Sequence, residues 1–208
     1  MNGIDFNDSL NKQQLTAVNC DEGNKLVLAG AGSGKTRVLT YRVAKLIKDF
    51  NIRPSDILAL TFTNKASREM KERIESLLRI SSQGLWFGTF HGICRRILKI
   101  HWKEAELSER FTILDSQDQL RLVKRIIKTN NLDEKLYDAK SIQSFINRKK
   151  DNGIRSNQTS EKDDEVYILV YKEYESILKQ TFSVDFADLI LKTYELLLNH
   201  ENILSYYV

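Results

Sequence analysis

The chain has 208 residues and a formal net charge of +4, with 41% hydrophobic and 29% charged residues. These proportions are typical of a soluble globular chain and exclude a disordered one. No apolar run approaches the roughly 18 residues that a membrane-spanning helix needs. The N-terminus is polar and acidic and does not resemble a signal peptide, so we expect a cytoplasmic protein with no membrane partner.

The cysteines and the charge distribution narrow the kinds of site to expect. Cys20 and Cys94 lie far apart, outside any metal-binding spacing, which predicts buried reduced thiols. Residues 1–110 hold 18 Lys and Arg against 12 Asp and Glu, whereas residues 111–208 hold 14 against 16. The basic excess favours a polyanionic partner for the first part, although ordinary surface charge would look the same.

Short apolar runs alternate with helical patterns in the first part of the chain. The period of the apolar residues distinguishes buried strands from amphipathic helices. We expect strands at Leu26–Ala29, Ile57–Thr61 and Leu85–Thr89, and helices at Thr36–Lys48, Asn64–Leu78 and Phe90–Trp102. This alternation predicts an α/β fold in which helices cover a parallel sheet.

The second part of the chain has a helical character. A capping-box spacing at Ser116 opens one helix, and no strand is expected between Asp115 and Ser183. The expected helices are Gln117–Lys128, Lys140–Lys150, Asp163–Lys179 and Phe186–Leu198. We therefore expect an all-helical subdomain at residues 111–183, inserted between a first part at 1–110 and a return at 184–208.

A glycine-rich loop follows the first expected strand and opens the first expected helix, which is the context of a phosphate-binding loop. Its residues are Ala29, Gly30, Ala31, Gly32, Ser33, Gly34, Lys35 and Thr36. We expect Lys35 to bridge the terminal phosphates of ATP and the Thr36 hydroxyl to bind Mg²⁺, as the catalytic residues of this loop. The alternative is a glycine-rich turn that binds nothing, and the strand–loop–helix order with Gly-Lys-Thr argues against it.

Two polar–aromatic segments follow the second and third expected strands, at the sheet edge where ligands gather in α/β folds. An exposed ring suits stacking on a base, and neighbouring polar groups suit phosphates. These segments predict a single-stranded DNA contact made by Phe62, Asn64, Thr89 and His91.

In order and spacing, these segments resemble the UvrD/Rep/PcrA group of superfamily-one DNA helicases. The resemblance is strong from Leu10 to Leu98 and patchy through the helical part. It rests on a Q motif at 10–14 (LNKQQ), the loop AGAGSGKTRVL at 29–39, a motif Ia at 58–74 (LALTFTNKASREMKERI), GTFH at 88–91 and DFADL at 185–189. Ala29 stands where the strict loop pattern has glycine.

The resemblance implies a RecA-like lobe that binds ATP and Mg²⁺ and moves on single-stranded or partly duplex DNA, in the 3′ to 5′ direction. It implies that Gln14 reads the adenine edge, for which an amide supplies both a donor and an acceptor. It also places Arg37 close to the nucleotide.

Each of these residues has a plainer interpretation when taken singly. These are a core position for Phe62, a helix-start hydrogen bond for His91, a helix-surface amide for Gln14, a surface ion pair for Arg37, and simple N-terminal charges of a helix for Asp185 and Asp188.

A hydrolysing motor of this kind also needs acidic residues after a further apolar strand. Asp163, Asp164 and Glu165 begin a helix after a polar loop and are set aside. The acids and the second lobe with its arginine finger are not found, so we expect a truncated helicase that does not hydrolyse ATP by itself. The alternatives are the motor of a helicase–nuclease subunit and a stand-alone ATP- or DNA-binding module.

Overall fold

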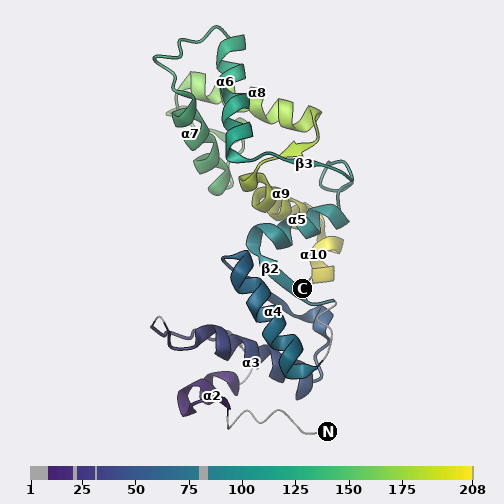
Figure 1. Ribbon diagram of the computed structural model, residues 1–208. Helices are drawn as coiled ribbons and strands as arrows, with labels where there is room; N and C mark the ends of the chain where they lie inside the picture. Colours follow the sequence, from purple (N-terminus) through teal and green to yellow (C-terminus); the bar gives the residue numbers. More distant parts are fainter. Residues whose placement is uncertain (1–8, 21–22, 31, 80–83, 208) are drawn as a thin grey trace. The chain divides into compact units, whose positions relative to one another are not determined.

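The computed structural model describes residues 9–20, 23–30, 32–79 and 84–207. The fold is α/β, as predicted, with small parallel sheets and many helices (Figure 1). The chain divides into two compact units, Met1–Ile93 and Cys94–Val208, and each is described by itself. Within the described ranges, no helix is both long enough and apolar enough to cross a bilayer.

The first unit contains a two-stranded parallel sheet with helices packed against it. Leu58 lies opposite Trp86 and Thr61 opposite Thr89, so the two strands end at the same edge. A parallel pair needs a crossover connection, which α4 provides. The elements are α2 (Lys12–Val18), α3 (Lys35–Lys48), the short 3-10 helix η1 (Pro54–Asp56), β1 (Leu58–Thr61), α4 (Asn64–Leu78), β2 (Trp86–Thr89) and the beginning of α5 (Phe90–Ile100).

The core of this unit lies between α3, α4 and the sheet. Met70 and Ile74 are one helical turn apart on α4, so both side chains face the same way and are fully buried. They pack with Val43 of α3 and with Ala59 of β1. The helical periods read from the sequence therefore correspond to real buried faces.

The expected strand at Leu26–Ala29 is wrong for this structure. The segment forms no strand, and Leu26 and Leu28 are 82% and 84% exposed. A strand is maintained by hydrogen bonds to a neighbour, and in the described part of this unit β1 pairs with β2 alone. The full RecA-like sheet stays a prediction.

The second unit is mainly helical. Its core joins buried faces of α6, α7 and α8, with Val123, Ile146 and Tyr171 among the fully buried side chains. All four predicted helices are present, within two residues of their expected ends. The elements are β3 (Thr112–Ile113), α6 (Ser116–Thr129), α7 (Ala139–Asp151), the 3-10 helix η2 (Ser156–Gln158), α8 (Glu165–Gln180), β4 (Ser183–Val184), α9 (Phe186–Asn199) and α10 (Glu201–Tyr207).

Two short strands bracket the helices α6 to α8. Thr112 pairs with Ser183 and Ile113 with Val184 in a parallel arrangement, so the two ends of this helical segment lie side by side. Strands of two residues are too short to show a period, which is why the sequence did not reveal them. The insert boundaries 111–183 stay a prediction.

The start of α6 differs from the expected capping box. Asp115, and not Ser116, is the N-cap residue, because its Oδ1 accepts hydrogen bonds from the backbone N–H groups of Gln117 and Asp118, both at 2.8 Å. A carboxylate also complements the positive end of the helix dipole, which favours Asp over Ser here.

The cysteines also differ from expectation. Cys20 and Cys94 are free thiols, but both are partly exposed and not fully buried. Burial of the Cys94 side chain is still sufficient to raise the pKa of its thiol.

Candidate nucleotide and nucleic-acid site

The glycine-rich loop turns sharply into α3. Gly32 and Gly34 have φ angles of +77° and +87°, a region that residues with a Cβ rarely adopt. The Ser33 hydroxyl donates to the Gly30 carbonyl at 2.7 Å and closes the turn. Ala31, one of the predicted loop residues, lies outside the described residues.

The Lys35 side chain folds back over this loop. Its Nζ donates to the carbonyl oxygens of Ala29 at 2.6 Å and Gly30 at 2.8 Å. Helix α3 begins at Lys35 after Gly34, which has no side chain to cap the first N–H groups. Uncapped N–H groups and a cation at a helix N-terminus together favour an anion such as a phosphate. Thr36 follows in the first turn and is exposed.

Gln14 is held against the phosphate-binding loop. Its Nε2 donates to the Ser33 carbonyl at 3.0 Å. A capping box at the start of α2 orients it, because Gln14 N donates to Asn11 Oδ1 at 2.9 Å and Asn11 N donates to Gln14 Oε1 at 3.2 Å. A Cβ added at Gly34 would lie 2.7 Å from this Nε2. The interpretation of Gln14 as a plain surface amide is therefore wrong, and its role in reading adenine stays a prediction.

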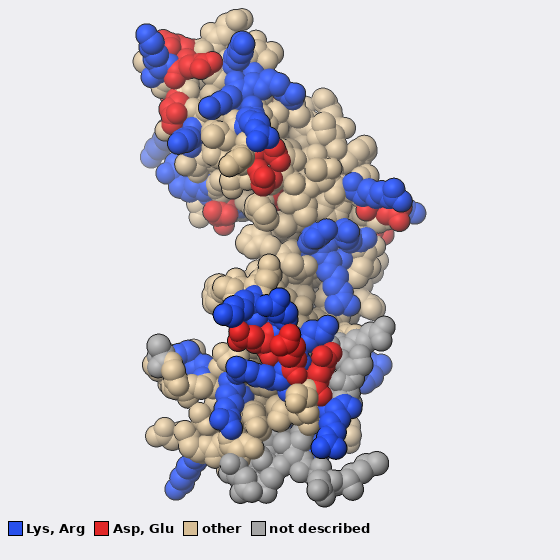
Figure 2. Space-filling view, in the orientation of Figure 1, with Lys and Arg blue, Asp and Glu red and all other residues tan. Residues whose placement is uncertain are grey.

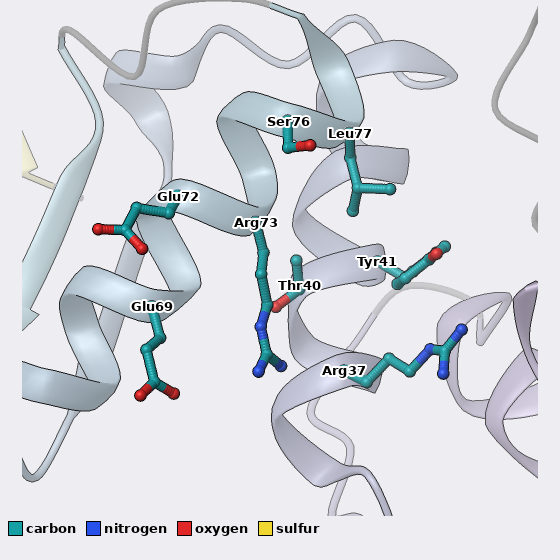
Figure 3. A pocket seen from close by; sticks show the side chains of 8 residues that line it. All are labelled: Arg37, Thr40, Tyr41, Glu69, Glu72, Arg73, Ser76 and Leu77. Atoms are coloured by element: carbon teal, nitrogen blue, oxygen red, sulfur yellow. The ribbon is translucent and has the colours of Figure 1, made fainter.

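Arg37 lies in the first turn of α3, and its side chain lines an open groove. Its guanidinium carbon lies 5.8 Å from the centroid of the Tyr41 ring, a cation–π geometry, and no ion pair of Arg37 occurs in the described part of the chain. The groove, of about 710 Å³, runs between α3 and α4, and Arg73 extends into it from α4 (Figure 3). The sequence did not indicate this groove, because five of its eight lining residues belong to α4 and lie at least 28 positions along the chain from those of α3.

The two polar–aromatic segments meet at one edge of the sheet. Because Thr61 lies opposite Thr89, Phe62 and Phe90 follow side by side, with ring centroids 6.2 Å apart and planes tilted by 47°. Phe62 is 93% exposed, so its interpretation as a core residue is wrong. Phe90 was not among the contact residues predicted from the sequence, although its place in the GTFH segment was a signal.

The polar residues of these segments shape the turns behind the rings. Thr63 caps α4, since its Oγ1 accepts from the backbone N–H of the third helical residue at 3.1 Å, and Asn64 is the exposed first residue. Thr89 Oγ1 accepts from Gly92 N at 3.2 Å, and His91 is exposed in the first turn of α5. The structure therefore brings the four predicted DNA-contact residues to the same edge.

The DFADL segment lies in the second unit, in a buried ionic cluster. Asp185 caps α9, with its Oδ1 accepting from Asp188 N at 2.8 Å. Lys150 Nζ lies 2.7 Å from Asp185 Oδ2 and 2.7 Å from Asp188 Oδ2, and Tyr174 OH donates to Asp185 Oδ2 at 2.8 Å. All four side chains are buried, so each acid is more than a simple helix-end charge.

Arg155 extends this cluster towards the surface. It donates to Asp188 Oδ1 at 2.7 Å and to both carboxylate oxygens of Glu195 at 2.6 Å. Burial alone would raise the pKa of the Asp188 carboxyl, but Lys150 and Arg155 outweigh it and hold that pKa below its usual value. Burial, followed by the charge of Asp185, raises the pKa of Tyr174. Fully paired in this way, the cluster has a structural role that fixes α7 to α9.

The acidic residues set aside in the sequence also have structural contacts. Asp163 Oδ2 pairs with Lys149 Nζ at 2.6 Å and accepts from Ser160 N at 2.9 Å. Asp164 caps α8, and Glu165 is the first residue of that helix. These contacts explain Asp163 and Asp164 without a catalytic role, and Glu165 lies where an acid complements the positive end of the helix dipole.

Known proteins resemble this chain over nearly its whole length. The family model of the UvrD/REP helicase N-terminal domain matches residues 10–208. The chain belongs to this helicase family. It is 47% identical over 203 residues to DNA helicase II of Escherichia coli, covering 96% of this chain and 28% of that protein. It is 42% identical over 202 residues to ATP-dependent DNA helicase PcrA of Bacillus subtilis, covering 95% and 27%.

Membership of the UvrD/REP family confirms the resemblance that the motifs indicated. The chain spans about 28% of the length of such relatives, in their N-terminal part. Both relatives are named as DNA helicases, and the Bacillus subtilis protein is named as ATP-dependent. The roles of Lys35, Gln14 and Phe62 in this chain stay predictions.

Proposed function

We propose that this chain is the ATP- and single-stranded-DNA-binding N-terminal part of an ATP-dependent DNA helicase. The observation that carries the proposal is the cluster around the glycine-rich loop, where Lys35, Gln14 and the uncapped start of α3 converge. The cluster supports the proposal because the Lys35 ammonium and the uncapped N–H groups of α3 place positive charge at the same turn, where a phosphate would be favoured.

In this proposal the loop N–H groups and Lys35 hold the ATP phosphates, and Arg37 lies beside the nucleotide. When ATP binds, the Lys35 ammonium exchanges its two carbonyl contacts for phosphate oxygens, which are stronger partners for a cation. The Thr36 hydroxyl would hold Mg²⁺, which neutralises charge on the phosphates. Thr36 fits this role as an exposed oxygen donor beside Lys35.

Single-stranded DNA is proposed to run over the edge where β1 and β2 end. Phe62 and Phe90 offer two exposed ring surfaces for stacking on bases, and Asn64, Thr89 and His91 supply polar groups for phosphates. Stacking on aromatic rings accepts any base, which suits a motor that moves along DNA regardless of sequence.

We further propose that these 208 residues bind nucleotide without turning it over. Hydrolysis in this class needs one acid at the metal and another group that orients water. Asp163 and Asp164 are occupied by an ion pair and a helix cap, and Asp185 and Asp188 are buried against Lys150. The parent helicase would supply the acids and the second lobe from elsewhere.

Titration of the chain with a fluorescent ATP analogue tests the nucleotide site. We expect Lys35→Ala to weaken binding by about 2–3 kcal/mol, roughly 30- to 150-fold, because a charged hydrogen-bond donor to phosphate is lost. Lys71→Ala, at an exposed position of α4, is the matched control and should change nothing. Equal affinity of both variants for the analogue would contradict the assignment.

A further inference from the structure

Helix α2, which presents Gln14, is too short to persist by itself. It has seven residues, and isolated helices below about 12–15 residues are marginal in water. Helix α2 packs against α3 (Figure 1), and its buried residue Val18 clusters with Leu10 and with Val38 of α3. The position of Gln14 therefore depends on the contacts that hold α2 to α3.

Arg42 of α3 binds the C-terminal end of α2. Its Nη1 donates to the carbonyl oxygen of Val18 at 2.9 Å. Val18 is the last residue of α2, and the last carbonyl groups of a helix have no partner within that helix. A cation also complements the negative end of the helix dipole. The contact therefore holds this end of α2 on α3.

Arg42 differs from Arg68, an arginine of the same unit that forms an ion pair. Arg68 lies 4.0 Å from Glu72, with both side chains exposed on α4. Figure 2 shows Lys and Arg side chains together with Asp and Glu side chains over α4. Arg42 is partly buried, and its guanidinium carbon lies 5.9 Å from the centroid of the Phe50 ring. Because the guanidinium group is planar and its donors are fixed, Phe50 and the Val18 carbonyl restrict it to one geometry.

These contacts close a ring that joins Gln14 to the glycine-rich loop. Gln14 Nε2 donates to the Ser33 carbonyl of the loop at 3.0 Å, and Lys35 begins α3 directly after that turn. Arg42 lies further along α3, about 10 Å from Lys35 at 1.5 Å per residue, and returns the connection to α2 at Val18. The ring fixes the distance between the Gln14 amide and the loop, and Arg42 supplies its second link.

We propose that Arg42 is a positioning residue that sets the preference for adenine over guanine by holding Gln14 in place. The inference rests on the proposed function, in which Gln14 reads the base and Lys35 holds the phosphates. Adenine offers a donor and an acceptor to the Gln14 amide, whereas guanine offers two acceptors. A hydrogen bond weakens steeply as its geometry departs from the optimum, so a displaced Gln14 distinguishes the two bases less. Arg42 contacts α2 and not the loop, so its loss should leave phosphate binding intact.

Competition titrations of the 208-residue chain against a fluorescent ATP analogue test the proposal. ATP and GTP as competitors measure base selectivity, and inorganic tripolyphosphate, which has no base, measures phosphate binding alone. The variant is Arg42→Met, which removes the donor and keeps most of the apolar stem. The matched control is Arg53→Met, at an arginine of the same unit that is 80% exposed and pairs with Asp56 at 2.9 Å. Arg42→Lys keeps a cationic donor, and circular dichroism checks that all variants are folded.

We expect Arg42→Met to lower the ratio of ATP to GTP affinity by on the order of tenfold, to the value of Gln14→Ala, with no further loss when the two are combined. Affinity for tripolyphosphate should remain that of the parent chain, and Arg42→Lys should retain more selectivity than Arg42→Met. Parent-like selectivity in Arg42→Met would overturn the inference. An equal loss of ATP and tripolyphosphate affinity would also overturn it, in favour of a purely structural role. Failure of the parent chain to bind tripolyphosphate would overturn the proposed nucleotide site as well, so the two failures are distinguishable.

Discussion

Replacing Lys150 by methionine is expected to destabilise the second unit by about 3 kcal/mol, because it leaves two buried carboxylates without their shared cation. Lys150 Nζ lies 2.7 Å from an oxygen of both Asp185 and Asp188, and its side chain is 0% exposed. Methionine has a similar length and no charge, so the substitution removes the ammonium while leaving most of the volume filled.

The size of the effect follows from the contacts that remain. Removing one partner of a buried ion pair costs about 3–5 kcal/mol. Asp188 would still pair with Arg155 at 2.7 Å, and Asp185 would still accept a hydrogen bond from the Tyr174 hydroxyl at 2.8 Å. These remaining partners place the expected loss at the lower end of that range.

Urea denaturation, followed by circular dichroism and by hydrogen exchange of residues 139–199, measures this loss. The matched control is Lys179→Met, which removes an ammonium from the pair with Glu106, where the two side chains are 75% and 70% exposed. An exposed pair contributes about 0–1 kcal/mol, so the control should unfold almost like the parent chain. Equal midpoints for the two variants would refute the reasoning that burial of the cluster decides its strength.

The pH dependence of the stability of the second unit provides a second check, because the pKa of Asp188 fixes the direction of the effect. The pKa of the Asp188 carboxyl is lower in the folded chain than in the unfolded chain, where it is about 3.9. The ionised carboxylate therefore adds to the free energy of unfolding above about pH 3.9, and this stabilisation is lost as the pH falls through the lower folded pKa. Without Lys150, the pKa of Asp188 in the folded chain is lowered by less. The stability gap between the parent chain and Lys150→Met should therefore narrow as the pH falls below about 4.

Further substitutions test the proposed sites. Gln14→Ala should reduce discrimination between ATP and GTP in competition titrations; unchanged discrimination would contradict an adenine-reading role. Gly34→Ala should weaken nucleotide-analogue binding, because the φ of +87° strains any L residue and the new Cβ would meet the Gln14 amide at 2.7 Å. Phe62→Ala should cost about 1–3 kcal/mol in oligothymidylate binding, while Phe62→Trp should retain it. Phosphate release by the 208-residue chain should stay at background with or without single-stranded DNA, and robust release abolished by Lys35→Ala would show that a catalytic carboxylate is present.

Local patterns predicted much of the helical structure. The apolar period of α4 placed that helix at Asn64–Leu78, the same bounds that the structure shows. The pattern at Leu26–Ala29 failed because an apolar run records a preference for burial, whereas a strand also needs a neighbour, which the run cannot specify.

The sequence by itself determined the family, the glycine-rich loop with Lys35 and Thr36, and most of the helices, because these depend on residues close together in the chain. Only the tertiary structure decided that Gln14 lies against Ser33, that Phe62 lies beside Phe90, and that Lys150 pairs with both Asp185 and Asp188. Each of these contacts joins residues at least 19 positions apart, and the chain must pack its helices and strands before such partners can meet.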